Sequence, residues 1–302
     1  MKKQLQLVAT FLGVFISADA QKSETAQLLV HYKFTHVRDT NDKAHPYTEN
    51  MVLFVGNSAG AYWSYDAIAL DEQFKKAWAA AAASSPDGNV MINRRGGGTR
   101  IQYYQYPNEQ KLFTKDRMMG NDYLIEGPIP TIDWKISGDT ATFGDLHCQK
   151  ANGHFKGRDY IVWFCPDLPV HTGPWKLNGL PGVIVDACDS KNEVVFKFDG
   201  VEKATLAKRQ QVGDPNIAEK DLPPILRGLN YDPNLIQPPA NAIKTTQKEF
   251  DKLKEAMRKD PVGLANAVEA ANVADGRKVD HVVSTSFTGP VFNNPLELPE
   301  NK

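Results

Sequence analysis

After its first twenty residues the chain has no apolar run that approaches the ~20 residues of a membrane-spanning helix. It also has no excess of either charge, because 35 Lys and Arg stand against 36 Asp and Glu, a formal net charge of −1. Proteins that bind nucleic acid or anionic membranes carry a basic surplus that is missing here. We therefore expect no transmembrane segment in the mature chain and no nucleic-acid partner. The sequence indicates no cofactor and does not identify the partner; a component of the envelope or outer membrane is one candidate.

Cysteine is scarce too, and the three residues, Cys148, Cys165 and Cys188, form no C-x-x-C pair. Zinc sites usually show such close spacings. A metal site would have to combine two of these thiols with His147 and His154. We predict no metal site, and a metal-binding periplasmic protein is the weakest of three functional hypotheses.

The first twenty residues have the pattern of a secretory signal peptide. Lys2 and Lys3 are followed by the mostly apolar run Leu5–Ile16, and Ala18 and Ala20 supply small residues at cleavage spacing. The run is too short to span a bilayer comfortably. We expect residues 1–20 to be removed after Ala20, leaving a protein in the periplasm or outside the cell.

Most of the mature chain has the pattern of β-strands. Short apolar or alternating runs are separated by Gly, Pro and Asn, which favours consecutive antiparallel hairpins. We predict a mainly β domain over residues 21–205, with an antiparallel sheet arranged as a sandwich or half-barrel. The expected strands are Val30–Phe34, Met51–Val55, Ile101–Tyr106, Lys111–Thr114, Tyr123–Ile125 and Ile132–Ile136.

Two helical regions are expected beside this sheet. The alanine-rich stretch Asp71–Ala83 predicts an inserted helix lying on the sheet. Residues 206–302 predict a proline-rich segment and then C-terminal helices that pack on the β domain. The first of these starts at Thr246, where Thr246 and Glu249 fit a capping box. Its apolar stripe, which we expect to pack on the sheet, consists of Phe250, Leu253 and Met257. A further helix is expected from Pro261.

One hairpin can be predicted residue by residue. Lys156-Gly157 forms a two-residue loop, because glycine tolerates the positive φ of such turns. The resulting register places Cys148 directly opposite Cys165 in a non-hydrogen-bonded pair, near the short end of the Cα separations that disulfides span. We predict a disulfide between these two and leave Cys188 over. A competing turn at Asn152-Gly153 would offset the cysteines.

Three stretches carry a family resemblance. GPWKLNGLPGVI, at 173–184, resembles the signature of the GLPGLI family, exported proteins typical of the Bacteroidetes. HCQKANGHFKGRDYIVWF, at 147–164, is similar to the aromatic-rich block of that family, and NNPLEL, at 293–298, resembles its usual ending. Val183 stands where the family name has leucine. The resemblance implies an exported envelope protein of mainly β fold, and it implies no catalytic residue.

The signature itself invites two interpretations. Gly179-Leu180-Pro181-Gly182 combines permissive glycines with a φ-restricted proline and predicts a rigid corner. In the structural interpretation, Trp175 is a core residue beside this corner. In the functional one, Trp175 and Lys176 form a contact surface for a ligand or partner.

The most tempting catalytic motif is GNSAG, at 56–60, which matches the G-x-S-x-G nucleophile elbow of α/β-hydrolases. A secreted serine hydrolase with Ser58 as nucleophile is therefore the second hypothesis. An elbow needs a helix directly after it, and the following AYWSYDAIAL is a poor helix start. A turn between two strands is the favoured interpretation.

The glycine-rich basic stretch Arg94–Arg100 lacks the G-K-[ST] of a phosphate-binding loop and indicates a surface loop. No convincing catalytic constellation emerges. The leading expectation is therefore an exported cell-envelope protein of unknown molecular function, a non-enzymatic binding or accessory factor.

Overall fold

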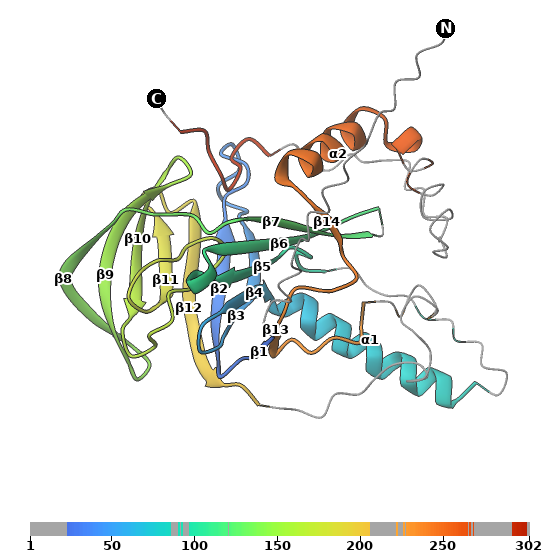
Figure 1. The fold of residues 1–302 in the computed structure, drawn as a ribbon, viewed down its shortest axis with the longest axis horizontal. Helices are drawn as coiled ribbons and strands as arrows, with labels where there is room; N and C mark the ends of the chain where they lie inside the picture. Colours follow the sequence, from blue (N-terminus) through green and yellow to red (C-terminus); the bar gives the residue numbers. More distant parts are fainter. Residues whose placement is uncertain are drawn as a thin grey trace, which may run out of the picture.

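The computed structural model describes residues 23–85, 97–119, 121–205, 228–264 and 292–300, with the single residues 90, 92, 222, 226, 266 and 268. The expected signal peptide lies outside the described residues, as do Pro215, Pro223 and Pro224 of the expected proline-rich segment. Strands dominate the fold, which confirms the predicted mainly β class (Figure 1).

One large sheet organises the molecule. Its twelve strands follow the order β14-β7-β6-β5-β4-β3-β2-β12-β11-β10-β9-β8, and all neighbours are antiparallel except β14 and β7. The strands are β2 (Leu28–His36), β3 (Tyr47–Val55), β4 (Gly60–Ser64), β5 (Gln102–Tyr106), β6 (Lys111–Met118), β7 (Asn121–Pro128), β8 (Trp134–Phe143), β9 (Leu146–Phe155), β10 (Arg158–Cys165), β11 (Val183–Asp189), β12 (Val194–Lys203) and β14 (Ile243–Thr245). A separate pair joins β1 (Glu24–Thr25) to β13 (Leu235–Ile236).

The sheet is strongly curved, with β8 to β12 curling away from the half formed by β2 to β7 (Figure 1). Register shifts in β8, β10 and β12 mark bulges, which bend strands locally. The main apolar core lies on the concave face and draws residues from β2 to β4 and from β9 to β12.

The opposite face of β3 to β7 carries a second apolar cluster. On β3, Met51 and Leu53 belong to the concave core, whereas Val52 and Phe54 belong to the second cluster, the alternation of a strand with two covered faces. Helix α1 (Tyr65–Ala83) lies along this second face (Figure 1), with Ile68 against the cluster. The prediction of an inserted helix is confirmed.

The start of α1 differs from the expected Asp71, because the helix begins six residues earlier. Ser64 is the N-cap, and its Oγ accepts a hydrogen bond from the N–H of Ala67 at 3.0 Å. Asp66 adds a favourable negative charge in the first turn. Two of the three aromatic residues that made this stretch a poor helix start belong to β4, and the third, Tyr65, is the first residue of the helix.

Helix α2 (Gln247–Lys259) has the predicted capping box, formed by Thr246 and Glu249. Phe250 is buried against Tyr123 and Ile125 of β7, so the expected packing of this helix on the sheet is confirmed. Residues 261–264 are helical as well, in line with the helix expected from Pro261. None of the described helices is both long enough and apolar enough to cross a bilayer.

The β9–β10 hairpin turns at the predicted loop. Lys156 and Gly157 have φ values of 52° and 69°, the two positive φ angles of a type I′ turn. Phe155 pairs with Arg158, and the same register continues along both strands. The competing turn does not occur, because Asn152-Gly153 lies within β9.

The disulfide expected from this register is not formed in the structure. Cys148 and Cys165 are both buried free thiols, and Cys188 is free as well. Burial raises the pKa of Cys148 to about 12, so little of it is the thiolate that disulfide exchange requires. Oxidation of this pair stays a prediction.

Candidate functional site

The signature stretch lies inside the fold. We call residues 168–182, which connect β10 to β11, the core loop. Trp175 of this loop is only 2% exposed and packs near the rings of Phe155, Tyr160 and Phe196, with centroids 5.4, 6.5 and 6.5 Å away. Its burial leaves little of Trp175 for a contact surface, and the structural interpretation of the motif describes its position.

One buried amide makes hydrogen bonds between the sheet and the core loop. The Gln105 side chain of β5 donates to the carbonyl oxygens of Gly173 and Trp175 at 3.0 and 2.9 Å. Its own oxygen accepts from the N–H of Gly173 at 3.2 Å. Buried backbone groups need such partners, because unpaired ones are costly.

The four motif residues make the expected corner. Gly179 has φ of 90°, a conformation that a side chain would strain. Gly182 is needed for another reason, since a Cβ there would collide with the carbonyl oxygen of Cys165. Leu180 is buried and Pro181 is exposed. The motif shapes the backbone where the core loop enters β11.

Lys176 is partly exposed and forms an ion pair with Glu297. Glu297 belongs to residues 292–300, which we call the C-terminal segment. The carbonyl of Asn294 in this segment is bound by His36 Nε2 at 2.9 Å, and the Asn294 side-chain amide donates to the carbonyl of Val37 at 2.7 Å. Lys176 thus holds two parts of the fold together.

The same segment covers a buried ion pair between β10 and β11. Arg158 and Asp189 meet at 2.6 Å, and each side chain is only 2% exposed. Arg158 also donates to Asn294 Oδ1 and to the carbonyl of Pro295, at 2.7 and 2.8 Å. Together with the Asp189 pair, these bonds supply acceptors for the N–H groups of a buried guanidinium. The polar network therefore has a structural role.

Ser58 lies in the tight turn between antiparallel β3 and β4. Its hydroxyl donates to a carboxylate oxygen of Glu24 at 2.9 Å, and the backbone N–H groups of Asn57 and Ser58 point to the same carboxylate. The turn therefore binds a carboxylate of the chain itself. No helix follows it directly, since β4 comes first. This geometry is that of a hairpin turn and differs from a nucleophile elbow.

The four residues of the metal-site alternative do not gather. His147 pairs with Asp167 at 3.1 Å, while His154 pairs with Asp159 at 2.6 Å. Among the residues that the structure describes, no group of three or more His, Cys, Asp or Glu is close enough to hold a metal ion.

A cleft of about 410 Å³ opens on the face of the sheet that carries α1. We refer to it as the cleft; α1, strands β4 to β7 and the segment 228–241 form its walls. Its lining residues are Trp63, Ser64, Ala67, Ile68, Asp71, Thr99, Arg100, Gln102, Tyr104, Lys115, Arg117, Asp122, Gly228, Asn230, Tyr231, Asp232, Leu235, Gln237, Pro238, Pro239, Ala240 and Asn241. Its volume is within the range of small-molecule sites.

On the α1 side of the cleft, Asp71 is almost fully buried. Arg100 Nη1 donates to both of its carboxylate oxygens, at 2.9 and 3.2 Å. The hydroxyl of Tyr231 donates to the same carboxylate at 3.4 Å. Arg100, expected on a surface loop, therefore lies against a buried carboxylate and orders one wall.

On the sheet side, Lys115 and Arg117 extend from β6 toward Asp122 of β7. Lys115 is 9% exposed, and its Nζ lies 3.5 Å from Asp122, beyond normal hydrogen-bond length. Arg117 Nε lies 3.9 Å from the same carboxylate. Burial is the main cause that lowers the pKa of Lys115, and the neighbouring Arg117 and Arg100 lower it further, against the pull of Asp122. This cation is desolvated, and Asp122 compensates it loosely.

Among the described residues, five buried side-chain polar atoms lack hydrogen-bond partners. Three of them, the hydroxyls of Tyr62, Tyr160 and Thr172, lie in the main core and the core loop, and two lie in the cleft walls. The two in the cleft walls are the indole N–H of Trp63 and the Oδ1 oxygen of Asp122. The Trp63 ring is held by Tyr104 and Tyr231, at centroid distances of 6.0 and 5.4 Å. A molecule bound in the cleft would add hydrogen bonds to this donor and this acceptor.

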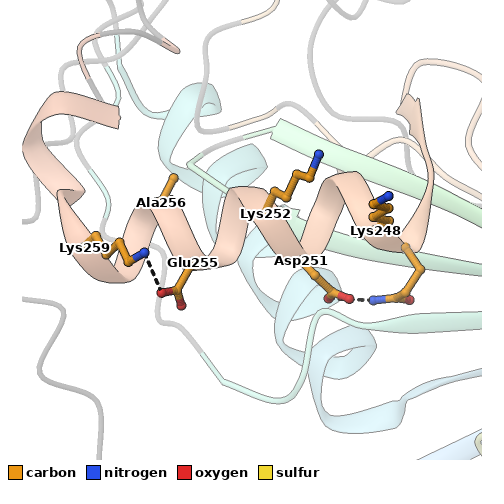
Figure 2. A pocket seen from close by; sticks show the side chains of 7 residues that line it. Lys248, Asp251, Lys252, Glu255, Ala256 and Lys259 are labelled. Atoms are coloured by element: carbon orange, nitrogen blue, oxygen red, sulfur yellow. Dashed lines mark hydrogen bonds and ion pairs between the residues drawn. The ribbon is translucent and has the colours of Figure 1, made fainter.

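A second depression, of about 780 Å³, lies along the exposed face of α2 (Figure 2). Its side chains pair with one another along the helix, Gln247 with Asp251 at 2.8 Å and Glu255 with Lys259 at 3.2 Å. Such pairs four residues apart are common on solvated helix faces. This surface is open and internally paired, and we do not take it as a site.

Sequence reasoning missed the cleft. Its residues come from five separate parts of the chain, and no local motif joins them. One local signal was present: Lys115 and Arg117 are two residues apart on β6, so both project from the same face of the strand. A charged pair on a covered face of a strand indicates a polar site.

No family model matches the chain, and no curated protein matches it. Two solved structures of PNGF-II, in space groups C2 and P21, align with TM-scores of 0.46 and 0.47 and sequence identities of 9% and 11%. Each alignment covers 75% of this chain and 32% of the PNGF-II chain. The chain thus spans about a third of those proteins, and at TM-scores below 0.5 neither alignment bears on its activity.

Proposed function

We propose that this chain is an exported cell-envelope protein that acts as a non-enzymatic binding factor, with the cleft as its binding site. The basic start, apolar run and Ala18-x-Ala20 pattern support export. The resemblance to the GLPGLI family supports an envelope location. The signature stretch forms a corner of the core and carries no reacting group, which agrees with a non-enzymatic role.

The unpaired donor and acceptor in the cleft walls are the observation that carries the binding role. Trp63 and Asp122 offer hydrogen bonds that no described residue completes. The charged groups nearby are engaged as ion pairs, for example Asp71 with Arg100. Such a wall can hold and orient a small molecule. Ser58, the candidate nucleophile, lies in the β3–β4 turn, which does not line the cleft.

Export is tested by fractionating cells of the source bacterium and sequencing the mature N-terminus. We expect the protein in the envelope or medium, starting at Gln21. A cytoplasmic protein that retains residues 1–20 would contradict the proposal.

Binding is tested by native mass spectrometry of the protein purified from the envelope fraction. We expect a bound small molecule that is lost in Gln237→Trp, because Gln237 is exposed at the cleft and a bulky ring there fills the space. Thr48→Trp, at an exposed site of β3 outside the cleft, is the control. Equal occupancy in both variants would argue against the cleft.

An exported protein also meets oxidants, so the thiols provide an independent check. Non-reducing peptide mapping of the same material should find Cys148 linked to Cys165 and Cys188 free. The expected reaction is thiol–disulfide exchange, in which two thiols are oxidised and a disulfide of the oxidant is reduced to two thiols. A linkage that includes Cys188 would contradict the register-based pairing.

A further inference from the structure

The charge distribution of the cleft indicates the kind of ligand it takes. Three cations, Arg100, Lys115 and Arg117, lie close enough for the two arginines to act electrostatically on the lysine. Three carboxylates line the cleft as well: Asp71 is paired with Arg100 at 2.9 Å, Asp122 lies 3.5 Å from Lys115, and Asp232 accepts from the N–H of Asn234 at 2.9 Å. A buried ammonium is costly unless it is closely paired. An oxyanion placed beside Lys115 would supply the close partner that Asp122 does not.

The two unpaired atoms add a second requirement. The indole N–H of Trp63 needs an acceptor, and Asp122 Oδ1 needs a donor. A hydroxyl group can do both, since it donates one hydrogen bond and accepts others. Amides on the same walls can likewise donate and accept, and they are Gln102, Asn230, Gln237 and Asn241. A ligand with several hydroxyl groups fits this mixture better than a simple anion.

From these two observations we infer that the cleft binds a hydroxylated carboxylate of about the size of a sugar acid. The carboxylate lies beside Lys115, and hydroxyl groups meet Trp63, Asp122 and the amides. The volume of about 410 Å³ suits a molecule of one or two sugar rings. This inference rests on the proposed binding function and specifies its ligand class.

The test is isothermal titration calorimetry of the full mature chain with three probes: galacturonate, galactose and inorganic phosphate. We expect galacturonate to bind at least about tenfold more tightly than either of the others, because only galacturonate combines a carboxylate with several alcohol hydroxyl groups. Lys115→Met should weaken galacturonate binding about tenfold or more, the scale of a lost charge-assisted hydrogen bond. Lys33→Met is the matched control, since Lys33 is exposed on β2, outside the cleft, and its loss should leave binding unchanged.

Two further variants keep the test decisive if Lys115→Met unfolds. Arg117→Gln removes a more exposed cation of the same strand and should weaken galacturonate binding several-fold. Trp63→Phe removes the indole N–H and keeps an aromatic ring. Binding should fall about three- to tenfold, while the melting temperature falls only slightly, because the loss of an unpaired buried donor offsets part of the cost of the cavity.

Three outcomes would overturn the ligand class. Galactose that binds as tightly as galacturonate removes the role of the cations. Phosphate that binds as tightly removes the role of the hydroxyl groups. If Lys115→Met and Arg117→Gln bind galacturonate as tightly as the wild type, the cleft residues have no role in binding. If no probe binds while native mass spectrometry still finds a molecule that Gln237→Trp excludes, the ligand class fails and the binding function stands.

Discussion

The two faces of the curved sheet are covered in different ways. The concave face is filled by the core loop, whose Trp175 is buried among aromatic rings and whose carbonyls are paired by Gln105. The opposite face of β4 to β7 is covered by α1 and the segment 228–241. It retains a cleft with a desolvated lysine and unpaired polar atoms. The concave face is closed by the core loop, although the hydroxyls of Tyr62, Tyr160 and Thr172 lack hydrogen-bond partners there among the described residues. The opposite face keeps an open cleft, which we propose as a binding site.

The residues that carry the family resemblance and the residues that we assign to binding therefore lie on different faces of the sheet. The stretch that carries the family resemblance, GPWKLNGLPGVI, lies on the concave face. The residues that we assign to binding, such as Lys115 and Trp63, belong to no recognisable motif. A short signature of glycine and proline is constrained by backbone geometry, whereas a cleft built from distant elements leaves no local pattern.

The largest expected effect tests how tightly the core loop is packed on the concave face. Gly182→Ala should lower the free energy of unfolding by about 4 kcal/mol, because the new Cβ collides with the carbonyl oxygen of Cys165 and the backbone cannot yield cheaply. Urea unfolding measures the change. Gly127→Ala is the control, since no atom lies within 4 Å of a Cβ there. Equal stability of the two variants would show that the core loop tolerates displacement.

Loss of the buried amide should be the next largest effect. Gln105→Met keeps the volume but leaves the carbonyls of Gly173 and Trp175 without donors, and we expect a loss of about 2–3 kcal/mol. Gln110→Met, at an exposed turn, should change stability by less than about 0.5 kcal/mol. Ligand binding by Gln105→Met should remain unchanged in calorimetry. A folded Gln105→Met that no longer binds would mean that the two faces are coupled.

The faces should also differ in their response to pH. Burial lowers the pKa of His36, beneath the C-terminal segment, to about 4, so the folded protein keeps it neutral. The unfolded chain takes up this proton below about pH 6.5, so stability falls as the pH drops from about 6.5 toward 4. When the pH is lowered from 7 to 5, His36 should reduce the free energy of unfolding by about 2 kcal/mol.

His36→Gln preserves a donor for the carbonyl of Asn294 and cannot titrate. Urea unfolding at pH 7 and pH 5 should therefore show a difference smaller by about 2 kcal/mol than in the wild type. His154, whose exposed ring has a raised pKa because it bonds Asp159 and Glu300, acts in the opposite direction and is the same in both proteins. An unchanged pH dependence would place the acid sensitivity elsewhere.

The smallest effect concerns the turn that resembles a catalytic motif. Ser58→Ala removes one exposed hydrogen bond to Glu24 and should cost about 0.5–1 kcal/mol or less. A fluorophosphonate probe should give no labelling that depends on Ser58. Labelling of the wild type that disappears in Ser58→Ala would revive the hydrolase hypothesis and contradict the assignment of function to the cleft.

The parts of the fold that were predicted correctly are local. The Lys156-Gly157 turn fixed the register of β9 and β10, and the capping box at Thr246 marked the start of α2. In both cases residues close in sequence contain the determining interaction. The early start of α1 depends on the capping hydroxyl of Ser64, which stands between the aromatic residues Trp63 and Tyr65.

The parts that were missed depend on distant pairs. The C-terminal segment was recognised as a family-like ending, yet its contacts with His36 and Arg158 could not be inferred from spacing. The cleft is of the same kind: Asp71 and Arg100 meet only because α1 folds back along the sheet. Sequence periodicity indicates which face of a helix or strand is buried, but it does not identify the segment that covers that face.

The late position of the C-terminal segment has a consequence for biogenesis. Asn294 completes the surroundings of Arg158 and His36, residues made more than a hundred positions earlier. A chain emerging from a ribosome or a translocation channel therefore carries an unfinished interior until this segment arrives. Closing so large a loop is slow. In the export that we propose, this delay keeps the nascent polypeptide loosely folded until it has crossed the membrane.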